Sequence, residues 1–421
     1  MSRNRLLRLL MIVAWAATGC VTLPGQGPTQ YGTGESGPSS PPDTTAGQDK
    51  SQASLYTLPD IRPGVRPPLH TDEAGLWMMM DKVEEKLKTS GNLVRDPKIN
   101  GYVRGIVCRL AGPYCKDIRT YVVRVPVFNA TMAPNGVMQV WTGLILRTRN
   151  EAQLATVLGH EIGHYLRRHS VQGMRDAIAA SNFLIFFQMA AAYAGVPVAG
   201  DVAGLVAIGA LLAYNRDHER EADAIGHRLL VENGLDPREA PRIWDQLIRE
   251  RDADDDSTRP PLFLSTHPPS DERSETLTRL GNEAIGDGPP GEIGRTRFLE
   301  VFLPHRKSFL RDDLRVGNFP RTLELLEMLR DDGENLAELN YFEGEVYRLR
   351  KKKGDLEKAL EAYSESLNLD DPPPEIHRSM GLVFSKLDRK TEARASFRRY
   401  LELMPDAEDN MMIRHLLGTM S

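Results

Sequence analysis

The spacing of apolar positions predicts helices at the start of the ordered chain. Apolar residues recur at helical spacing over 76–87, Thr71 stands where an N-cap is expected, and Gly91 ends the pattern. A second helix is predicted over 97–110, because proline is favoured at the first helical position. Residues 71 onward are therefore expected to fold.

The next segment changes to a β pattern. Residues 120–128 are β-branched and aromatic, which predicts a strand, and a second strand is predicted at 137–141. The sequence Pro-Asn-Gly at 134–136 is a strong turn signal. Pro126 indicates an exposed or irregular edge, on which an extended peptide could dock. A purely structural hairpin would show the same pattern.

Helical spacing then returns and continues with one unusual segment. Asn150 is predicted to cap a helix, with Gln153 in the reciprocal position. Residues 177–215 contain a single charged residue, Asp201, and are interrupted near the middle by glycine and proline. We interpret this segment as a helical hairpin, buried or resting in a membrane surface, with a two-span transmembrane insertion as the alternative.

The C-terminal part is predicted to be helical throughout and carries a degenerate repeat. Glycine, alanine and aromatic residues at tetratricopeptide spacing would let paired helices pack closely into a solenoid, and a generic helical bundle is the alternative. A weaker unit surrounds residues 317–326. The residues in phase are Gly381, Phe384, Ala393, Phe397 and Pro405 in the last unit, and Gly344, Tyr347, Gly354, Ala359, Tyr363 and Pro372 in the unit before it.

Composition narrows the class of protein. The 421 residues suffice for two or three domains, and the formal net charge is −5. Lysine and arginine are scattered rather than clustered, so nucleic acid is not an expected partner. Only three cysteines occur, which excludes a disulfide scaffold and a cysteine-rich metal site.

The N-terminus is predicted to be a targeting segment. A basic start precedes a short apolar run over 9–17, and Ala-Thr-Gly then leads to Cys20, which resembles a bacterial lipobox. We predict that Cys20 carries a lipid anchor in the membrane; an ordinary secretory signal is the alternative. Since no aspartate follows Cys20, resemblance to Gram-negative sorting rules predicts the outer membrane, facing the periplasm. Residues 21–70 are polar and rich in glycine and proline, which predicts a disordered tether.

Export would place the other two cysteines in an oxidising compartment. Cys108 and Cys115 are separated by six residues around Gly112 and Pro113. A disulfide between them is therefore predicted, and closing so short a loop stabilises by about 2–3 kcal/mol. Two buried free thiols are the alternative.

The candidate chemistry lies in the helix that follows Asn150. His160, Glu161 and His164 form an H-E-x-x-H motif, in which both imidazoles project from one helix face toward one Zn²⁺. Glu161 is placed to take a proton from a water that the metal acidifies. Five loosely specified residues are only moderately specific, so the rest of the chain must supply a third ligand.

The third ligand is expected on a later helix. In metzincins a third histidine follows the motif, but Arg167 and Ser170 occupy the corresponding positions here, which excludes that class. Glu219 and Asp223 are four apart and share a helix face, whereas Glu221 points elsewhere. One carboxylate can bind the metal while the other orients a ligand histidine. The residues alone leave both assignments open.

Together these motifs resemble a known family. The HEIGH sequence, a long apolar insertion and then Glu219-x-x-x-Asp223 are similar to gluzincin peptidases that include HtpX, the CAAX prenyl endopeptidases and the BepA-like proteases. The resemblance spans roughly 72–285, and the repeat tail resembles the BepA-like branch. It implies that Glu219 is the third zinc ligand and Asp223 the supporting acid. Further matching residues are Asn129-Ala130, Pro134-x-Gly136, and Thr266-His267-Pro268 followed by Arg273.

Two further residues of the pattern have open roles. His267 could approach the zinc as a removable fourth ligand, or stabilise an oxyanion once substrate displaces it; alternatively it holds a loop by hydrogen bonds. Arg273 is expected to anchor the His267 loop to a carboxylate. His169 and His218 are expected at the surface or behind the ligands.

The sequence thus predicts a mainly α fold, in which an α+β catalytic domain holds a small sheet beside the H-E-x-x-H helix and an α-solenoid follows. The predicted segments are a lipoprotein signal peptide (1–20), a disordered tether (21–70), a zinc metallopeptidase domain (71–285), a linker (286–297) and a tetratricopeptide-like domain (298–421).

The predicted function is zinc-dependent endopeptidase activity in the bacterial cell envelope, with one Zn²⁺ per chain held by His160, His164 and Glu219, and with Glu161 as the proton acceptor. The resemblance implies misfolded or misassembled envelope proteins as substrates. A different hypothesis is an assembly factor that binds a protein partner through its repeat groove and whose zinc is mainly structural.

Overall fold

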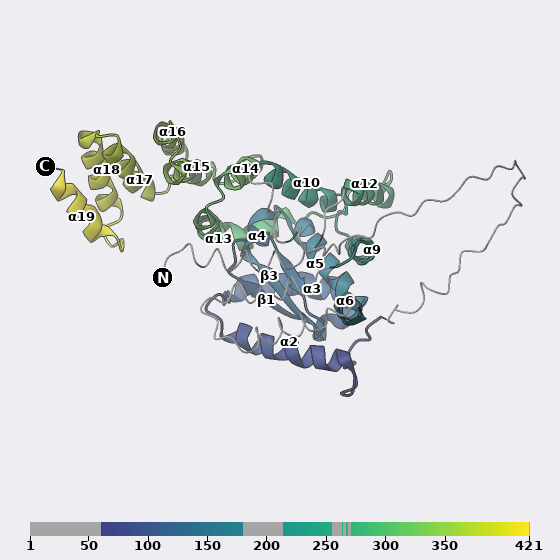
Figure 1. Ribbon diagram of the computed structural model, residues 1–421. Coiled ribbons are helices and arrows are strands. Elements are labelled where there is room, and N and C mark those ends of the chain that lie inside the picture. Colours follow the sequence, from purple (N-terminus) through teal and green to yellow (C-terminus); the bar gives the residue numbers. More distant parts are fainter. Residues whose placement is uncertain (1–59, 180–213, 255–262, 264–266, 268–270, 421) are drawn as a thin grey trace, which may run out of the picture. The chain divides into compact units, whose positions relative to one another are not determined.

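The computed structural model describes residues 60–179, 214–254, 263, 267 and 271–420, which form a mainly α fold with one small sheet (Figure 1). The predicted fold class is confirmed. The predicted signal peptide, Cys20 and nearly all of the tether lie outside the described residues, as do residues 180–213 of the long apolar segment. Among the described helices, none combines the length and hydrophobicity that a membrane span requires.

The first part of the chain places three consecutive strands between helices. Thr71 caps the first helix, as predicted, by accepting a hydrogen bond from the backbone N–H of Ala74 at 3.2 Å. The elements are α2 (Asp72–Thr89), α3 (Pro97–Ala111), the short 3₁₀ helix η1 (Gly112–Lys116), β1 (Arg119–Val123), β2 (Ala130–Met132), β3 (Val137–Trp141), α4 (Thr142–Arg147), α5 (Glu151–Leu166), α6 (His169–Ala179), α9 (Arg216–Glu232), α10 (Glu239–Asp252) and α12 (Asp271–Ile285).

The strand order differs from the prediction. The sheet runs β1-β3-β2, with β1 parallel to β3 and β2 antiparallel to it. A single strand over 120–128 was expected, but β1 ends at Val123 and the chain crosses over to a separate strand, β2. The ladder ends at the pair of Val123 with Trp141 because β3 also ends there and α4 begins at Thr142, and Pro126 has no N–H with which to extend it. The turn at 134–136 therefore joins β2 to β3, and β2 forms one edge of the sheet.

Alternation along the strands directs their side chains to two helical layers. Val122 and Met138 pack in the same core as apolar residues of α3 and α5. Val123 and Trp141 instead pack against Met80 and other residues of α2. Figure 1 shows α2 along one face of the sheet. The helix that carries the H-E-x-x-H motif thus rests on the face opposite α2.

A charged cluster joins α2 to β1. The carboxylate of Glu84, whose side chain is 6% exposed, accepts two hydrogen bonds from Arg119, each 2.7 Å, and one from the Tyr121 hydroxyl at 2.6 Å. Burial raises the pKa of Glu84, but the hydrogen bonds from Arg119 and Tyr121 outweigh it and hold the pKa at about 2. This cluster is stable while Glu84 is ionised.

Cys108 at the end of α3 and Cys115 in η1 are joined by a disulfide. The bond fixes the turn at Gly112, whose φ of 53° lies in the left-handed region that glycine tolerates. The two elements lead directly into β1.

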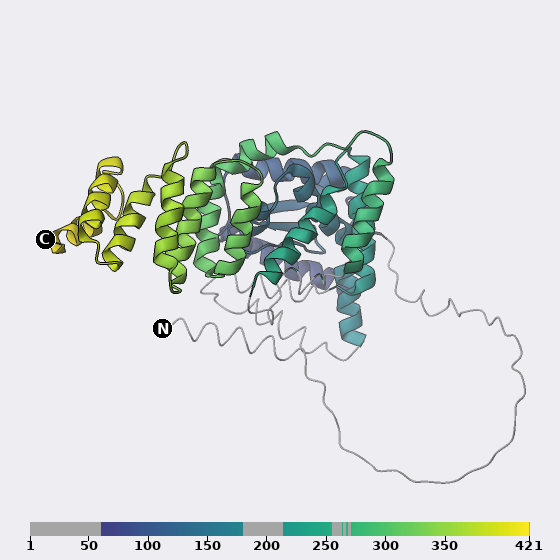
Figure 2. The same ribbon diagram turned by 90° about the horizontal axis from the view of Figure 1, so that it is seen from above.

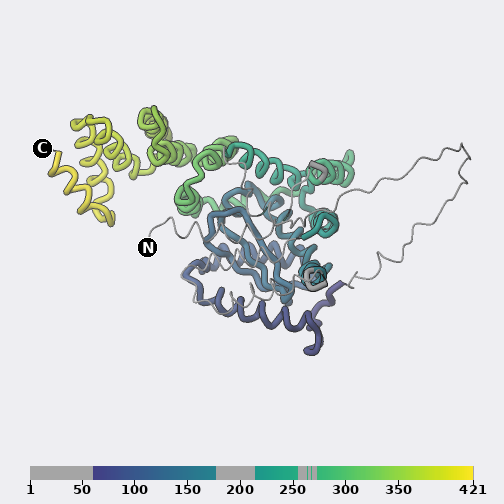
Figure 3. The backbone as a smooth tube through the Cα atoms, in the orientation of Figure 1, coloured from purple at the N-terminus to yellow at the C-terminus, as the bar shows by residue number. Residues whose placement is uncertain are grey.

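The C-terminal part consists of successive helices that pack as neighbours along the chain (Figures 2 and 3). Close pairs form between α15 and α16 and between α17 and α18. A Cβ atom on Gly344 would lie 2.3 Å from Tyr363, and one on Gly381 would lie 2.5 Å from Phe397. The missing side chains let each ring lie against the neighbouring helix. The helices are α13 (Arg295–Val316), α14 (Phe319–Arg330), α15 (Leu336–Arg350), α16 (Asp355–Leu367), α17 (Glu375–Lys386), α18 (Lys390–Leu403) and α19 (Asn410–Thr419).

A buried arginine connects α13 to the earlier helices. Arg147 at the end of α4 contacts Glu250 of α10 at 2.7 Å and Asp313 of α13 at 2.9 Å, and all three side chains are at most 7% exposed. A second pair on the same helix, Arg124 with Asp312, has a half-exposed arginine. The first helix of the C-terminal part is thus held by a buried charged network.

Candidate metal centre

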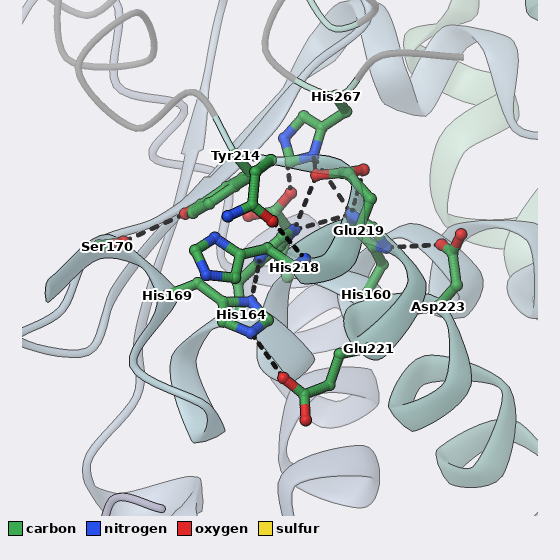
Figure 4. A network of polar contacts seen from close by, with 12 residues as sticks. His160, His164, His169, Ser170, Tyr214, His218, Glu219, Glu221, Asp223 and His267 are labelled. Atoms are coloured by element: carbon green, nitrogen blue, oxygen red, sulfur yellow. Dashed lines mark hydrogen bonds and ion pairs between the residues drawn. The ribbon is translucent and has the colours of Figure 1, made fainter. Parts of the chain in front are cut away.

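Two helices bring the sequence-predicted ligands together. His160 and His164 lie on α5 and Glu219 lies in the first turns of α9, and all three are at most 2% exposed. The Nε2 atoms of the two histidines are 3.0 Å apart. The Glu219 carboxylate lies 3.5 Å from His160 Nε2 and 3.4 Å from His164 Nε2. Figure 4 shows these side chains converging on one point.

Small residues let α5 and α9 approach closely enough for this. A Cβ on Gly226 would lie 2.9 Å from the backbone nitrogen of His160, and one on Gly163 would lie 3.0 Å from the Cα of Ala222. The two backbones therefore touch where no side chain separates them. As a result, a carboxylate on α9 reaches both histidines of α5.

A carboxylate and an arginine stand behind this group. Asp223 Oδ1 lies 2.9 Å from His160 Nδ1, so this ring nitrogen donates and Nε2 presents its lone pair to the cluster. Arg273 donates to Asp223 at 2.7 and 2.8 Å and lies 2.7 Å from Glu219 Oε2. Its guanidinium also stacks over Trp244, 4.3 Å from the ring centre. Arg273 thus holds the carboxylates of Glu219 and Asp223 in place.

His267 lies inside the cluster. Its Nδ1 is 3.2 Å from His160 Nε2 and 3.0 Å from Glu219 Oε1, and its Nε2 is 3.4 Å from Glu161 Oε1. The ring stacks on Phe263, with centroids 4.4 Å apart. Thr266 and Pro268, which flank His267 in the predicted motif, lie outside the described residues. The ligand-capable atoms of His160, His164, Glu219 and His267 all lie within 4.8 Å of one another.

Glu161 faces the same space from the first helix. It is 1% exposed, and its Oε1 is buried without a hydrogen-bond partner among the described residues. Burial raises the pKa of Glu161 to about 8, and the nearby charge of Glu219 adds to this. The neighbouring His160 and a backbone hydrogen bond from Met132 of β2 lower the pKa and oppose the effect of burial. A cation in the cluster would favour the ionised carboxylate. This group is therefore suited to gaining and losing a proton near neutral pH.

Three further residues lie near His164: Tyr214, which was not assigned to the site from sequence, and His169 and His218, which were expected either at the surface or behind the ligands. Tyr214 stacks on His164 with centroids 3.6 Å apart and contacts Ser170 through its hydroxyl. His169 and His218 are buried rather than at the surface, and their rings stack with centroids 4.2 Å apart. The helix break between α5 and α6 brings His169 back to the site. The spacing of apolar residues does not predict this break, which in the structure lies at Arg168, a residue in the left-handed region.

The donor set fits a divalent metal. Two imidazole nitrogens and a carboxylate are the ligands of catalytic zinc sites, and a third imidazole lies within reach. The Oε1 atom of Glu161 points to the same conclusion: it accepts no hydrogen bond from the described residues, although His267 Nε2 lies 3.4 Å away, and a buried polar atom is normally satisfied. Arranged in this way, the residues can hold a cation and place a proton acceptor beside it.

Comparison with known proteins agrees with this arrangement. Residues 94–280 match the sequence model of Peptidase family M48. The chain contains an M48 peptidase domain. That domain includes the complete four-residue cluster, and the match confirms the resemblance predicted from the motifs.

The M48 domain has named relatives. The chain is 28% identical over 306 residues to the beta-barrel assembly-enhancing protease of Escherichia coli (strain K12), covering 66% of this chain and 61% of that protein. It is 29% identical over 238 residues to a putative beta-barrel assembly-enhancing protease of Vibrio cholerae, covering 53% and 47%. It is 35% identical over 187 residues to the mitochondrial metalloendopeptidase OMA1 of Arabidopsis thaliana, covering 43% and 36%. The chain thus spans less than two thirds of each of these relatives.

Proposed function

We propose that this protein is a zinc-dependent endopeptidase. The observation that carries the proposal is the convergence of His160, His164 and Glu219 with the buried carboxylate of Glu161 beside them, whose Oε1 accepts no hydrogen bond from the described residues. The M48 match over the same residues supports it. In this proposal one Zn²⁺ is held by the two histidines and Glu219, while Asp223 and Arg273 orient them.

When bound, Zn²⁺ supplies Lewis acidity, which polarises the scissile carbonyl and lowers the pKa of water. Glu161 takes the proton of the attacking water at its carboxylate and then delivers it to the nitrogen of the leaving amine. Its buried position supports this double role, because the carboxylate can be protonated or ionised at moderate pH. His267 lies where a fourth ligand would bind, and we propose that it moves aside for substrate and then stabilises the oxyanion.

The sheet offers a place for an extended substrate. β2 is an edge strand, and the backbone of Met132 within it contacts Glu161. A peptide that adds to β2 by backbone hydrogen bonds would pass directly beside the proposed proton acceptor. Segments of this kind are exposed in unfolded rather than folded proteins. We therefore propose misfolded or misassembled envelope proteins as substrates, a choice that the names of the bacterial relatives also favour.

The proposed location is the bacterial cell envelope. The lipobox-like sequence before Cys20 supports a lipid anchor in the outer membrane, facing the periplasm, with residues 21–70 as the tether. The paired helices from α15 to α18 support a repeat domain of the tetratricopeptide type that binds a protein partner in its groove. The limits 71–285 and 298–421 for the two domains, with a linker at 286–297, stay predictions.

Substituting Glu161→Gln tests the mechanism. This variant should keep zinc, because Glu161 is not a ligand in the proposal, and should lose cleavage of an unfolded substrate such as reduced casein. His160→Ala, in contrast, should lose both zinc and cleavage. A Glu161→Gln protein that cleaves at the wild-type rate would refute the assignment.

The rival function is an assembly factor with a mainly structural zinc. The buried carboxylate of Glu161 beside the cluster, whose Oε1 accepts no hydrogen bond from the described residues, does not favour it. This rival would be supported if the Glu161→Gln variant rescued a cellular phenotype as well as the wild type, and if rescue were lost only on deletion of residues 298–421.

A further inference from the structure

A second histidine faces the proposed ligand His164 across the end of α5. His164 Nδ1 lies 2.8 Å from His169 Nδ1, and His169 Nε2 lies 3.0 Å from Glu221 Oε2 (Figure 4). The His164 and His169 side chains are fully buried, whereas that of Glu221 is 39% exposed. The contacts therefore lead in two steps from the cluster to the protein surface.

The ring nitrogens allow one arrangement of protons along this path. The Nε2 of His164 faces the cluster, so a ring that binds metal there carries its proton on Nδ1. That proton is donated to Nδ1 of His169, which must then carry its own proton on Nε2. The second proton is donated to the carboxylate of Glu221. Each ring nitrogen of His164 and His169 thus has one role, as metal ligand, hydrogen-bond donor or hydrogen-bond acceptor.

The two proposed ligand histidines are thus supported differently. His160 donates from Nδ1 directly to the carboxylate of Asp223. His164 donates to a neutral ring, and the carboxylate lies one residue farther away. Such outer partners fix the tautomer and orientation of a metal-binding imidazole. His169 occupies for His164 the position that Asp223 occupies for His160.

The backbone is bent in a way that makes this contact possible. On a continuous helix, residues five apart point about 140° away from each other, so His164 and His169 would not meet. Here α5 ends at Leu166, Arg168 adopts a left-handed φ of 57°, and α6 begins at His169. Arg168 also forms an ion pair with Glu73, which holds the bend in place.

We propose that His169 is a positioning residue for the metal ligand His164, and that it works through a hydrogen-bonded chain ending at Glu221. The inference rests on the proposed function only in taking His164 as a zinc ligand through Nε2. It adds a residue that the H-E-x-x-H motif and the α9 carboxylates do not include. Arg167, whose Nε lies 2.7 Å from Glu221 Oε1, fixes the far end of the chain.

The test compares two substitutions of nearly the same shape. Asparagine at this position can place its amide oxygen near the site of Nδ1 and accept from His164, whereas leucine cannot. Zinc affinity of the full chain is measured by competition with a chelator of known affinity. His169→Leu should lose about 10- to 100-fold in zinc affinity, and His169→Asn should recover most of that loss.

His218→Leu is the matched control. His218 stacks on the same His169 ring but lies outside the hydrogen-bonded chain, so its substitution tests packing alone. Zinc affinity should fall far less in His218→Leu than in His169→Leu. Thermal unfolding of the metal-free proteins checks that each variant folds. If His169→Leu does not fold, Glu221→Ala against Glu221→Gln makes the same comparison at an exposed residue, and only the alanine variant should weaken zinc binding.

Two results would overturn the role of His169, and a third would overturn the proposed zinc site itself. Equal zinc affinities for the wild type and His169→Leu would show that His169 positions nothing. A His169→Asn protein as weak as His169→Leu would assign the effect to ring packing instead of the hydrogen bond. A wild-type chain that binds no zinc would refute the proposed function itself, and that outcome is distinct from the other two.

Discussion

Among the described residues, Arg147 is the only cation in the buried network that joins α4, α10 and α13, and the substitution Arg147→Ala removes it. Arg147 is 7% exposed and contacts two carboxylates, Glu250 at 2.7 Å and Asp313 at 2.9 Å. These carboxylates are themselves only 4% and 5% exposed. The substitution therefore leaves two negative charges buried close together, with the Thr322 hydroxyl as a remaining donor to Asp313.

Removing one partner of a buried ion pair typically costs about 3–5 kcal/mol, because the remaining charge stays desolvated. The compact unit that contains Arg147 spans residues 55–421. With an unfolding entropy of about 2.1 cal/mol/K per residue, a loss of this size corresponds to a fall in melting temperature of roughly 4–7 °C. The loss should depend on pH. Burial raises the pKa of Glu250 even with Arg147 beside it, and without the arginine the pKa should rise further.

The sign of the pH dependence follows from this raised pKa. The folded variant holds a proton on Glu250 at a pH where the unfolded chain has released it. Stability of the variant should therefore fall as pH rises above the ordinary glutamate range, and recover as pH is lowered. The difference in melting temperature between wild type and Arg147→Ala should be smaller at pH 5.5 than at pH 7.5.

Arg124→Ala is the matched control, measured by the same thermal unfolding assay. Arg124 pairs with Asp312 on the same helix, but its side chain is 50% exposed, and Arg315 also contacts Asp312 at 2.8 Å. Loss of this pair should cost less than about 1 kcal/mol. If Arg147→Ala costs no more than Arg124→Ala, or if its effect does not change with pH, the reasoning from buried charge is wrong.

Three further predictions concern other parts of the fold. Gly344→Ala should destabilise by about 1–3 kcal/mol because its Cβ would lie 2.3 Å from Tyr363, whereas Gly105→Ala, with open space around it, should be neutral or stabilising; thermal unfolding distinguishes them. The folded pKa of Glu84 is about 2 against an ordinary 4.5, so the stabilisation from its ionised form is complete above pH 4.5 and lost toward pH 2. Between these pH values the free energy of unfolding of Glu84→Gln should therefore fall less than that of the wild type, by at most about 3 kcal/mol, as measured by circular dichroism. Cys108→Ala should lower stability by about 2–3 kcal/mol under oxidising conditions and have no effect in the presence of dithiothreitol, as urea unfolding would show.

The helices were largely predictable from sequence because their signals are local. Thr71 and Asn150 cap the helices expected of them, although the Gln153 side chain accepts its hydrogen bond from the backbone N–H of Arg149, one residue before the cap. The sheet was not predictable to the same degree. The parallel pairing of β1 with β3 joins segments that are not neighbours, and the three residues of β2 are too few to show a period.

The candidate site divides in the same way. The spacing of His160 and His164 fixes their common helix face, so a local rule sufficed. The positions of Glu219 and Asp223 relative to the histidines depend on how α9 packs on α5, which the residues alone left open. The Glu219 carboxylate lies 3.5 and 3.4 Å from the two Nε2 atoms, and the Asp223 carboxylate lies 2.9 Å from His160 Nδ1. The contact of His169 with His164 depends on the helix break at Arg168, which the spacing of apolar residues does not predict. Tertiary contacts of this kind cannot be predicted from local sequence patterns.

The close packing of α5 on α9 has a consequence for how inactive forms of this protein could arise. A single methyl group on Gly226 would press on the backbone of His160, and the helix that carries Glu219 would have to move away. Metal ligation tolerates shifts of only about 0.2 Å. A natural variant such as Gly226→Ala should therefore separate the proposed ligands on α5 from Glu219 and inactivate the centre, although each proposed ligand remains in its sequence. An inventory of ligand residues alone would count that variant among the active forms.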